Sequence, residues 1–185
     1  EEVLHGDTQD EARAHGDALG EQQQLVFVHP DDDEASAAGQ GTAALEILEA
    51  EPDLDTLVGD IGGGGLISGV ATAAKALQPG IRVVGVQTAR FPGAANAVTG
   101  STHAQGASTI AEGIAVSAPG ALCLPILRQR VDELLLVDEG DVEQAIVMLL
   151  EIEKTLAEGA GAVALAALLR HPQQFQGRQV GLVLS

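Results

Sequence analysis

The stretch that most constrains this chain runs from Thr56 to Gly69 and contains four consecutive glycines, Gly62 to Gly65. A short apolar run precedes the glycines, and Leu66 opens an apolar pattern at helical spacing after them. A strand, a glycine turn and a helix together aim several backbone N–H groups at one point. Because no Cβ stands in the turn, an anionic group can approach the backbone closely. The stretch therefore predicts a phosphate-binding loop, and a tight connection without a ligand remains the alternative.

Two common nucleotide-binding loops do not fit this stretch. A P-loop requires a lysine followed by serine or threonine after its last glycine, and no lysine lies in this turn. The dinucleotide fingerprint requires glycines at positions i, i+2 and i+5, but counting from Gly62 places Ile67 at the third position. Any phosphate bound here must therefore belong to another ligand class.

Composition narrows the possible partners and the compartment. The 185 residues carry a formal net charge of −18, which argues against binding to nucleic acid or to an anionic membrane surface. We find no apolar run of about 18 residues, the length needed to span a membrane, and no basic-then-apolar leader. The single cysteine, Cys123, excludes an internal disulfide. These features predict a soluble, cytoplasmic protein with one principal core.

Short apolar runs alternate with helical patterns along the chain. Five strands are expected: one in the apolar run that directly precedes Gly62, and the others at residues 25–28, 81–86, 134–137 and 180–184. Helices are expected at residues 9–19, around 43–48, and at 66–77, 141–152 and 162–169. This alternation is typical of an α/β fold with a mostly parallel, twisted sheet flanked by helices. Ligands of such sheets bind beyond the carboxyl ends of the strands, so we expect Ser185 to share an edge with the glycines.

Other segments carry weaker signals. The acidic run from Asp31 to Glu34 is most simply a solvated loop, and His29 is most simply a hydrogen-bonded histidine at a strand end. Residues 88–108 are expected to be irregular. The Glu158-Gly159-Ala160-Gly161 segment is expected to separate the last two helices.

The order of motifs resembles the fold-type II pyridoxal-phosphate enzymes, and among them the threonine/serine dehydratases. The segments that carry the resemblance are His5-Gly6-Asp7, Phe27-Val28-His29-Pro30, Gly39-Gln40-Gly41-Thr42, Gly62-Gly63-Gly64-Gly65-Leu66, Thr109-Ile110-Ala111-Glu112-Gly113, Glu158-Gly159-Ala160-Gly161 and Val183-Leu184-Ser185. The resemblance implies an incomplete large domain of such an enzyme in residues 31–185 and a remnant of the small domain in residues 1–30.

The resemblance also implies the roles of individual residues. Gly62, Gly63, Gly64, Gly65 and Leu66 match the loop that holds the phosphate of pyridoxal phosphate. Ser185 matches the serine whose hydroxyl meets the ring nitrogen, and Glu158 matches an acidic residue close to the cofactor. A solvated carboxylate at a helix break is the alternative for Glu158. In this chain the loop could hold phosphate or sulfate alone.

Some features depart from the family pattern. The family's catalytic lysine lies in a Ser-x-Lys motif upstream of everything present here, and neither Lys75 nor Lys154 matches its position. No residue of this chain is therefore assigned a catalytic role. Asp60 replaces an apolar residue or proline before the loop, and Asp31 stands where many relatives have an aromatic residue. The paired acidic residues of a divalent-cation site are missing after Gln87, so no metal is expected.

Two hypotheses about function follow. The chain is part of a dehydratase that converts a small amino acid, threonine or serine, into a 2-oxo acid and ammonia, and it is inactive in isolation. Alternatively, it is a non-catalytic module that binds a phosphorylated ligand or only oligomerises. On either view we expect exposed apolar surface and a homo-oligomer, most simply a dimer. We also expect a β-branched residue at Gly63 or Gly64 to occupy the space of the anion.

Overall fold

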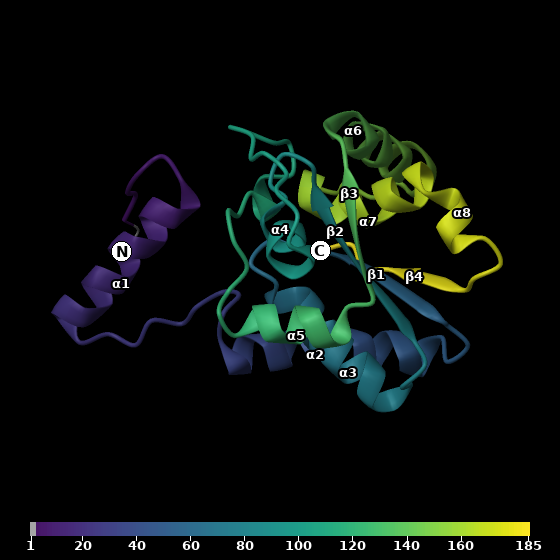
Figure 1. The fold of residues 1–185 in the computed structure, drawn as a ribbon, viewed down its shortest axis with the longest axis horizontal. Coiled ribbons are helices and arrows are strands. Elements are labelled where there is room, and N and C mark those ends of the chain that lie inside the picture. The colour runs from purple at the N-terminus through teal and green to yellow at the C-terminus, as the bar shows by residue number, and fades with distance from the viewer. Residues whose placement is uncertain (1–2) are drawn as a thin grey trace.

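The computed structural model describes residues 3–185, and Figure 1 shows its arrangement as a sheet between two layers of helices. The helices are α1 (Gln9–Gln23), α2 (Glu34–Ala50), α3 (Gly65–Leu77), α4 (Gly93–Thr99), α5 (Cys123–Arg130), α6 (Glu139–Met148), α7 (Gly159–Arg170) and α8 (Pro172–Phe175), with a 3-10 turn η1 (Glu112–Ile114) and a π-helical turn η2 (Leu149–Glu153). The strands are β1 (Thr56–Asp60), β2 (Arg82–Thr88), β3 (Glu133–Val137) and β4 (Val180–Leu182).

The four strands form one parallel sheet in the order β3-β2-β1-β4. Val58 of β1 pairs with Val84 of β2 on one side and with Leu182 of β4 on the other. Parallel neighbours require helical crossovers, which is why each strand here is followed or preceded by a helix. The predicted α/β class and the predicted common edge for the carboxyl ends of the strands are confirmed.

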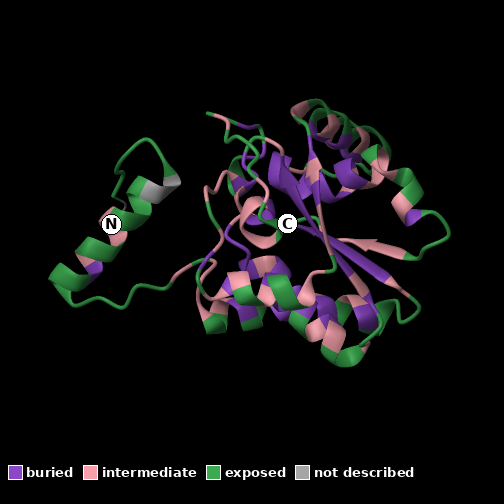
Figure 2. Cartoon of the chain, in the orientation of Figure 1, coloured by how far each residue is buried: buried purple, intermediate pink, exposed green. Residues whose placement is uncertain are grey.

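The sheet is buried on both faces. Val58, Val84 and Val86 pack against the alanine-rich α7 and against α6, whereas Leu57 and Val83 pack against α2 and α3. This alternation follows from the two-residue period of a strand. Figure 2 shows the buried residues concentrated in the sheet and on the inner sides of the helices. The core is therefore split into two apolar layers by the sheet.

The segment from Leu25 to Val28 is not a strand, and that prediction is wrong. Val26 is 89% exposed, and no strand among residues 3–185 lies beside this segment to pair with it. A strand requires a hydrogen-bonded neighbour, so an apolar run alone does not form one. Figure 1 shows that α1 and the extended segment after it stand apart from the sheet.

Three further boundaries differ from the predictions. Helix α4 lies inside the segment expected to be irregular, and α5 was not predicted. The break between α6 and α7 falls before the predicted glycines, because Glu158 is the N-cap residue and Gly159 already belongs to α7. Residues 3–185 contain no helix with the length and apolar character that a membrane crossing requires.

Glu139, in the first turn of α6, fastens a loop to the carboxyl edge of the sheet. Its carboxylate accepts hydrogen bonds from the hydroxyls of Thr88 (3.0 Å) and Thr109 (2.7 Å) and from the backbone N–H of Ile110 (2.8 Å). Burial raises the pKa of Glu139, but the bonds from Thr109, Ile110 and Thr88 outweigh it, so the net pKa is lowered. The bonds therefore favour the ionised carboxylate.

Replacing Glu139 by alanine removes these bonds, and we expect the free energy of unfolding at pH 7 to fall by about 1–3 kcal/mol. Since the folded pKa of Glu139 is lowered, its stabilisation is present above the unfolded pKa and is lost as the pH falls through the folded value. Urea denaturation of wild type and Glu139→Ala at several pH values measures both effects. Glu143→Ala, an exposed position on the same helix, is the control. An equal loss at all pH values, or none, would contradict the assignment.

Candidate functional site

The glycine loop joins the end of β1 to the start of α3 at the carboxyl edge of the sheet. The Ile61 N–H donates to the Val86 carbonyl at 2.8 Å, and the first helical bond runs from the Ser68 N–H to the Gly64 carbonyl at 3.0 Å. Between these two bonds, the N–H groups of Gly62 to Leu66 donate to no acceptor within residues 3–185. Free N–H groups at a helix start, with the positive end of the helix dipole, form an anion site. The loop therefore offers the free backbone donors that the predicted phosphate cradle requires.

The glycines are also required by packing. Gly64 has φ +102°, a left-handed conformation, and a Cβ there would lie 3.0 Å from the Cβ of Cys123. A Cβ on Gly63 would collide with the carboxylate of Asp31. A side chain at Gly63 or Gly64 would therefore meet Asp31 or Cys123, and its entry into the anion space stays a prediction. The loop thus packs tightly at its Cα atoms while its N–H groups remain free.

The acidic segment beside the loop is structured, so its interpretation as a solvated loop is wrong. The Asp32 carboxylate accepts from the N–H groups of Ala121 (2.9 Å), Leu122 (2.8 Å) and Cys123 (3.3 Å) at the start of α5. The cause is the set of N–H groups that a helix start leaves without partners. Asp32 thereby ties the segment after residue 30 to α5.

His29 is only partly satisfied. Its Nδ1 accepts hydrogen bonds from the N–H groups of Asp31 (3.0 Å) and Asp32 (2.7 Å), as expected for a histidine in a turn. Its Nε2 is buried and meets no partner in residues 3–185. The turn that His29 holds carries Asp31 to the glycine loop.

Ser185, Asp60 and Glu158 meet next to the loop. Ser185 follows β4, and its backbone carbonyl would lie 2.5 Å from a Cβ on Gly161, so only glycine allows this approach. Burial raises the pKa of Asp60, the Ser185 hydroxyl opposes the rise, and the charge of Glu158 adds to it. Asp60 ends β1 beside β4, the strand that Ser185 follows, because Val58 pairs with Leu182. The sequence had singled out Asp60 as a departure but had not placed it beside Ser185.

Glu158 also contacts the Thr109–Gly113 segment. Its Oε1 would lie 3.0 Å from a Cβ on Gly113, while a Cβ on Gly62 would lie 3.3 Å from the Cα of Ile114. Glu158 itself is exposed at the start of α7. Segments that lie far apart in the sequence therefore surround the glycine loop.

The two lysines lie outside this cluster. The Lys75 Nζ donates to the Ile81 carbonyl (2.9 Å) and forms an ion pair with Asp132 (2.7 Å), residues that precede β2 and β3. Lys75 is therefore at the opposite edge of the sheet from the glycines. The Lys154 Nζ donates to the Glu151 carbonyl in its own turn and is exposed. Both lysines therefore lie away from the glycine loop, but only Lys154 is a surface residue, because the Lys75 side chain is 14% exposed.

The arrangement suits a particular kind of ligand. Backbone donors at the glycine loop fit an anionic group, and the Ser185 hydroxyl beside the buried Asp60 fits a polar ring atom. One oxygen of Asp60, Oδ1, is buried and has no hydrogen-bond partner in the described part of the chain. A phosphorylated aromatic ring with a nitrogen atom, such as pyridoxal phosphate, matches this donor set.

Known proteins resemble the chain along its whole length. L-threonine ammonia-lyase of Geobacter sulfurreducens is 46% identical over 183 residues, covering 97% of this chain and 46% of that protein. The enzyme of the same name from Thermotoga maritima is 42% identical over 185 residues, covering 99% of this chain and 46% of its own length. The chain thus spans about half the length of these curated relatives.

Solved structures agree. A threonine deaminase whose source is given as T.th. superposes with a TM-score of 0.89 at 34% identity, covering 99% of this chain and 61% of that one. Maize serine racemase superposes with a TM-score of 0.88 at 31% identity, covering 99% and 57%. The family described as "Pyridoxal-phosphate dependent enzyme" matches residues 1–185. This chain therefore belongs to the pyridoxal-phosphate dependent enzyme family.

Proposed function

We propose that this chain forms the cofactor-anchoring part of a pyridoxal-phosphate dependent threonine/serine dehydratase. The reaction eliminates water from L-threonine or L-serine and yields a 2-oxo acid and ammonia. The observation that carries the proposal is the set of free N–H groups from Gly62 to Leu66, adjacent to Ser185 at one sheet edge. The names of the relatives supply the substrate class.

Each site residue has a role in this proposal. Gly62, Gly63, Gly64, Gly65 and Leu66 hold the phosphate through their backbone, Ser185 meets the ring nitrogen, and Glu158 lies near the ring. The bound cofactor supplies an electron sink for the charge that develops when the substrate loses its α-proton. The chain's own contribution is to fix the two ends of the cofactor, which sets the orientation of the ring.

Neither of the two lysines is placed to take the α-proton. Lys75 is held at the far edge of the sheet, and moving it would break its ion pair with Asp132. Lys154 is exposed beyond η2 and would have to be buried without a charged partner, at a cost of several kcal/mol. This observation favours the second candidate function, a module that binds the phosphorylated cofactor without performing the reaction.

We therefore expect the isolated 185-residue polypeptide to release no 2-oxobutyrate from threonine and no pyruvate from serine, even with excess cofactor. General-base and covalent catalysis supply much of the rate enhancement in such reactions, and both need a positioned amine. Product assays test this expectation, and borohydride reduction with peptide mapping detects any lysine bonded to the cofactor. Turnover together with a modified Lys75 or Lys154 would contradict it.

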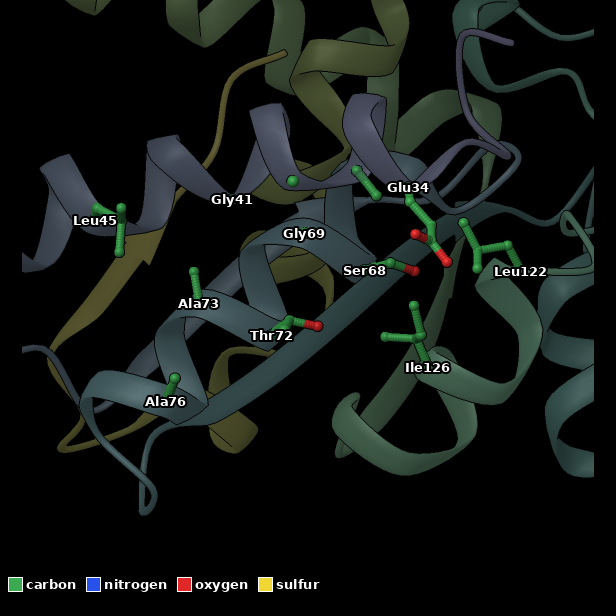
Figure 3. Close-up of a pocket in the computed structure, with 12 residues that line it drawn as sticks. Glu34, Gly41, Leu45, Ser68, Gly69, Thr72, Ala73, Ala76, Leu122 and Ile126 are labelled. Atoms are coloured by element: carbon green, nitrogen blue, oxygen red, sulfur yellow. The ribbon is translucent and has the colours of Figure 1, made fainter.

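We also propose that the chain forms a homo-oligomer, most simply a dimer. A groove of about 410 Å³ lies between α2, α3 and α5. Small residues such as Gly41 and Gly69 leave room there beside Leu45 and Ile126 (Figure 3). A second apolar cavity of about 420 Å³ lies between η2 and β4, around Ile152 and Leu184. Exposed apolar patches of this kind mark contact surfaces.

Light scattering at micromolar concentration tests the oligomer. The expected mass is a multiple of 18.8 kDa, or the sample aggregates. A clean monomer would contradict the proposal.

A single buried cysteine without a disulfide suits a reducing compartment, so we further propose a cytoplasmic location. The division into a small-domain part (residues 1–30) and a large-domain part (31–185) also stays a proposal, supported by the separation of α1 from the sheet in Figure 1.

A further inference from the structure

The carboxylate of Asp31 lies directly against the glycine loop. Its Cγ would lie 2.7 Å from a Cβ on Gly63, and its carboxylate oxygen Oδ2 would lie closer still. The main chain of Asp31 covers Gly65 in the same way, with its Cα 2.8 Å from a Cβ there. No hydrogen bond or ion pair in the described part of the chain uses the carboxylate oxygens of Asp31. A carboxylate with unused acceptors therefore stands beside the free N–H groups of the loop.

The position of Asp31 is fixed through its main chain. The Asp31 N–H donates to His29 Nδ1 at 3.0 Å, and the Cys123 Sγ donates to the Asp31 carbonyl at 3.3 Å. The next residue, Asp32, caps α5. Because none of these bonds involves the side chain of Asp31, that side chain is available to a ligand, and replacing it leaves the bonds of the turn in place.

A cavity of about 400 Å³ adjoins both Asp31 and the loop. Gly113 and Val116 line this cavity together with Asp31. The same two residues border the loop, since a Cβ on Gly62 would lie 3.4 Å from the Gly113 carbonyl oxygen and 3.4 Å from the Val116 Cγ2. Asp31 is therefore part of the wall of the space beside the first two glycines.

No cation in the described part of the chain forms an ion pair with Asp31. His29 Nδ1 accepts two N–H bonds, so that nitrogen carries no proton. Arg13 of α1 lines the same cavity as Asp31 but is exposed and forms no ion pair with it. The negative charge of Asp31 therefore acts on whatever the loop binds.

Phosphate and sulfate differ in one respect that matters beside a carboxylate. Inorganic phosphate carries at least one proton at neutral pH, and a phosphate monoester has a second pKa of about 6, whereas sulfate carries no proton. A protonated phosphate oxygen donates a charge-assisted hydrogen bond to a carboxylate. Sulfate oxygens only accept, so they meet a carboxylate with repulsion and no bond.

We propose that Asp31 makes the glycine loop selective for phosphate over sulfate, by accepting a hydrogen bond from a protonated phosphate oxygen. The backbone N–H groups of the loop hold the other oxygens. The inference rests on the proposed function and deepens it, because it specifies which anion the loop accepts. Asp31 is one of the positions at which this sequence departs from the family pattern, so the selectivity is a property of this chain.

The protonation state of a bound phosphate monoester follows from the same contact. The Asp31 carboxylate favours the protonated monoester, whereas the N–H donors and the dipole of α3 favour the dianion. Removing the carboxylate shifts this balance toward the dianion. The pKa of the bound phosphate is therefore lower in Asp31→Asn than in the wild type.

The first test is isothermal titration of the full chain with inorganic phosphate and with sulfate, at pH 7 and equal ionic strength. The wild type should bind phosphate at least about tenfold more tightly, as a charge-assisted bond provides. Asp31→Asn should reduce this ratio to about threefold or less, chiefly by binding sulfate more tightly, because an amide donates to either anion. Asp53→Asn, at an exposed acid before β1, changes the net charge equally and should leave the ratio unchanged.

The second test follows the ³¹P chemical shift of bound pyridoxine 5′-phosphate against pH, with an analogue that has no aldehyde to react with lysines. Asp31→Asn should lower the pKa of the bound phosphate by at least about one unit, a tenfold change in its proton affinity. Asp53→Asn should leave that pKa unchanged. The phosphate-to-sulfate ratio of the wild type needs no variant, so it tests the selectivity even if Asp31→Asn does not fold.

The outcomes are distinct. Equal affinity of the wild type for phosphate and sulfate would overturn the selectivity and leave anion binding standing. A ratio and a bound pKa that Asp31→Asn does not alter, or that Asp53→Asn alters as much, would overturn the role of Asp31. If phosphate, sulfate and pyridoxine 5′-phosphate all fail to bind the wild type, the proposed function itself fails and takes this inference with it.

Discussion

The structure depends on the burial of β1 at the centre of a parallel sheet. Both faces of this strand are covered, by α2 and α3 on one side and by α7 on the other. The turn from β1 to α3 lies at the carboxyl edge of the sheet, and other segments of the chain pack closely around it. This packing requires glycines, because Asp31 and Cys123 lie where side chains at Gly63 and Gly64 would project. The same turn leaves the N–H groups of Gly62 to Leu66 without partners among residues 3–185.

Electrostatics make the backbone the natural ligand-binding element. The chain has 27 acidic and 9 basic residues, and acids rather than lysines surround the loop. Asp31 lies against Gly63 and opposes an anion, whereas the helix dipole of α3 attracts one. Asp60 and Glu158 lie on the other side of the loop, near Ser185, so the two acids stand away from the free N–H groups. The acids and the free backbone donors therefore occupy different parts of the site.

Much of the fold could be predicted from the sequence, because the strands of a parallel sheet are short apolar runs and those around the glycines are fully buried. The edge that unites the glycine loop and Ser185 followed from that class alone. The Leu25–Val28 segment was misjudged, since a strand depends on a neighbour that no local pattern reveals. The capping of α5 by Asp32 and the proximity of Asp60 to Ser185 involve residues about 90 and 125 positions apart, and only the folded chain brings them together.

The central claim is that the backbone amides of the glycine loop bind the phosphate. Amide ¹H–¹⁵N shifts of the full chain, recorded during titration with inorganic phosphate and with pyridoxine 5′-phosphate, test it most directly. The account predicts that the largest saturable shifts occur at Gly62 to Leu66, while the amides of Ala121 and Leu122, already bonded to Asp32, change little. Saturable shifts at other positions, with the amides of Gly62 to Leu66 unchanged, would contradict it.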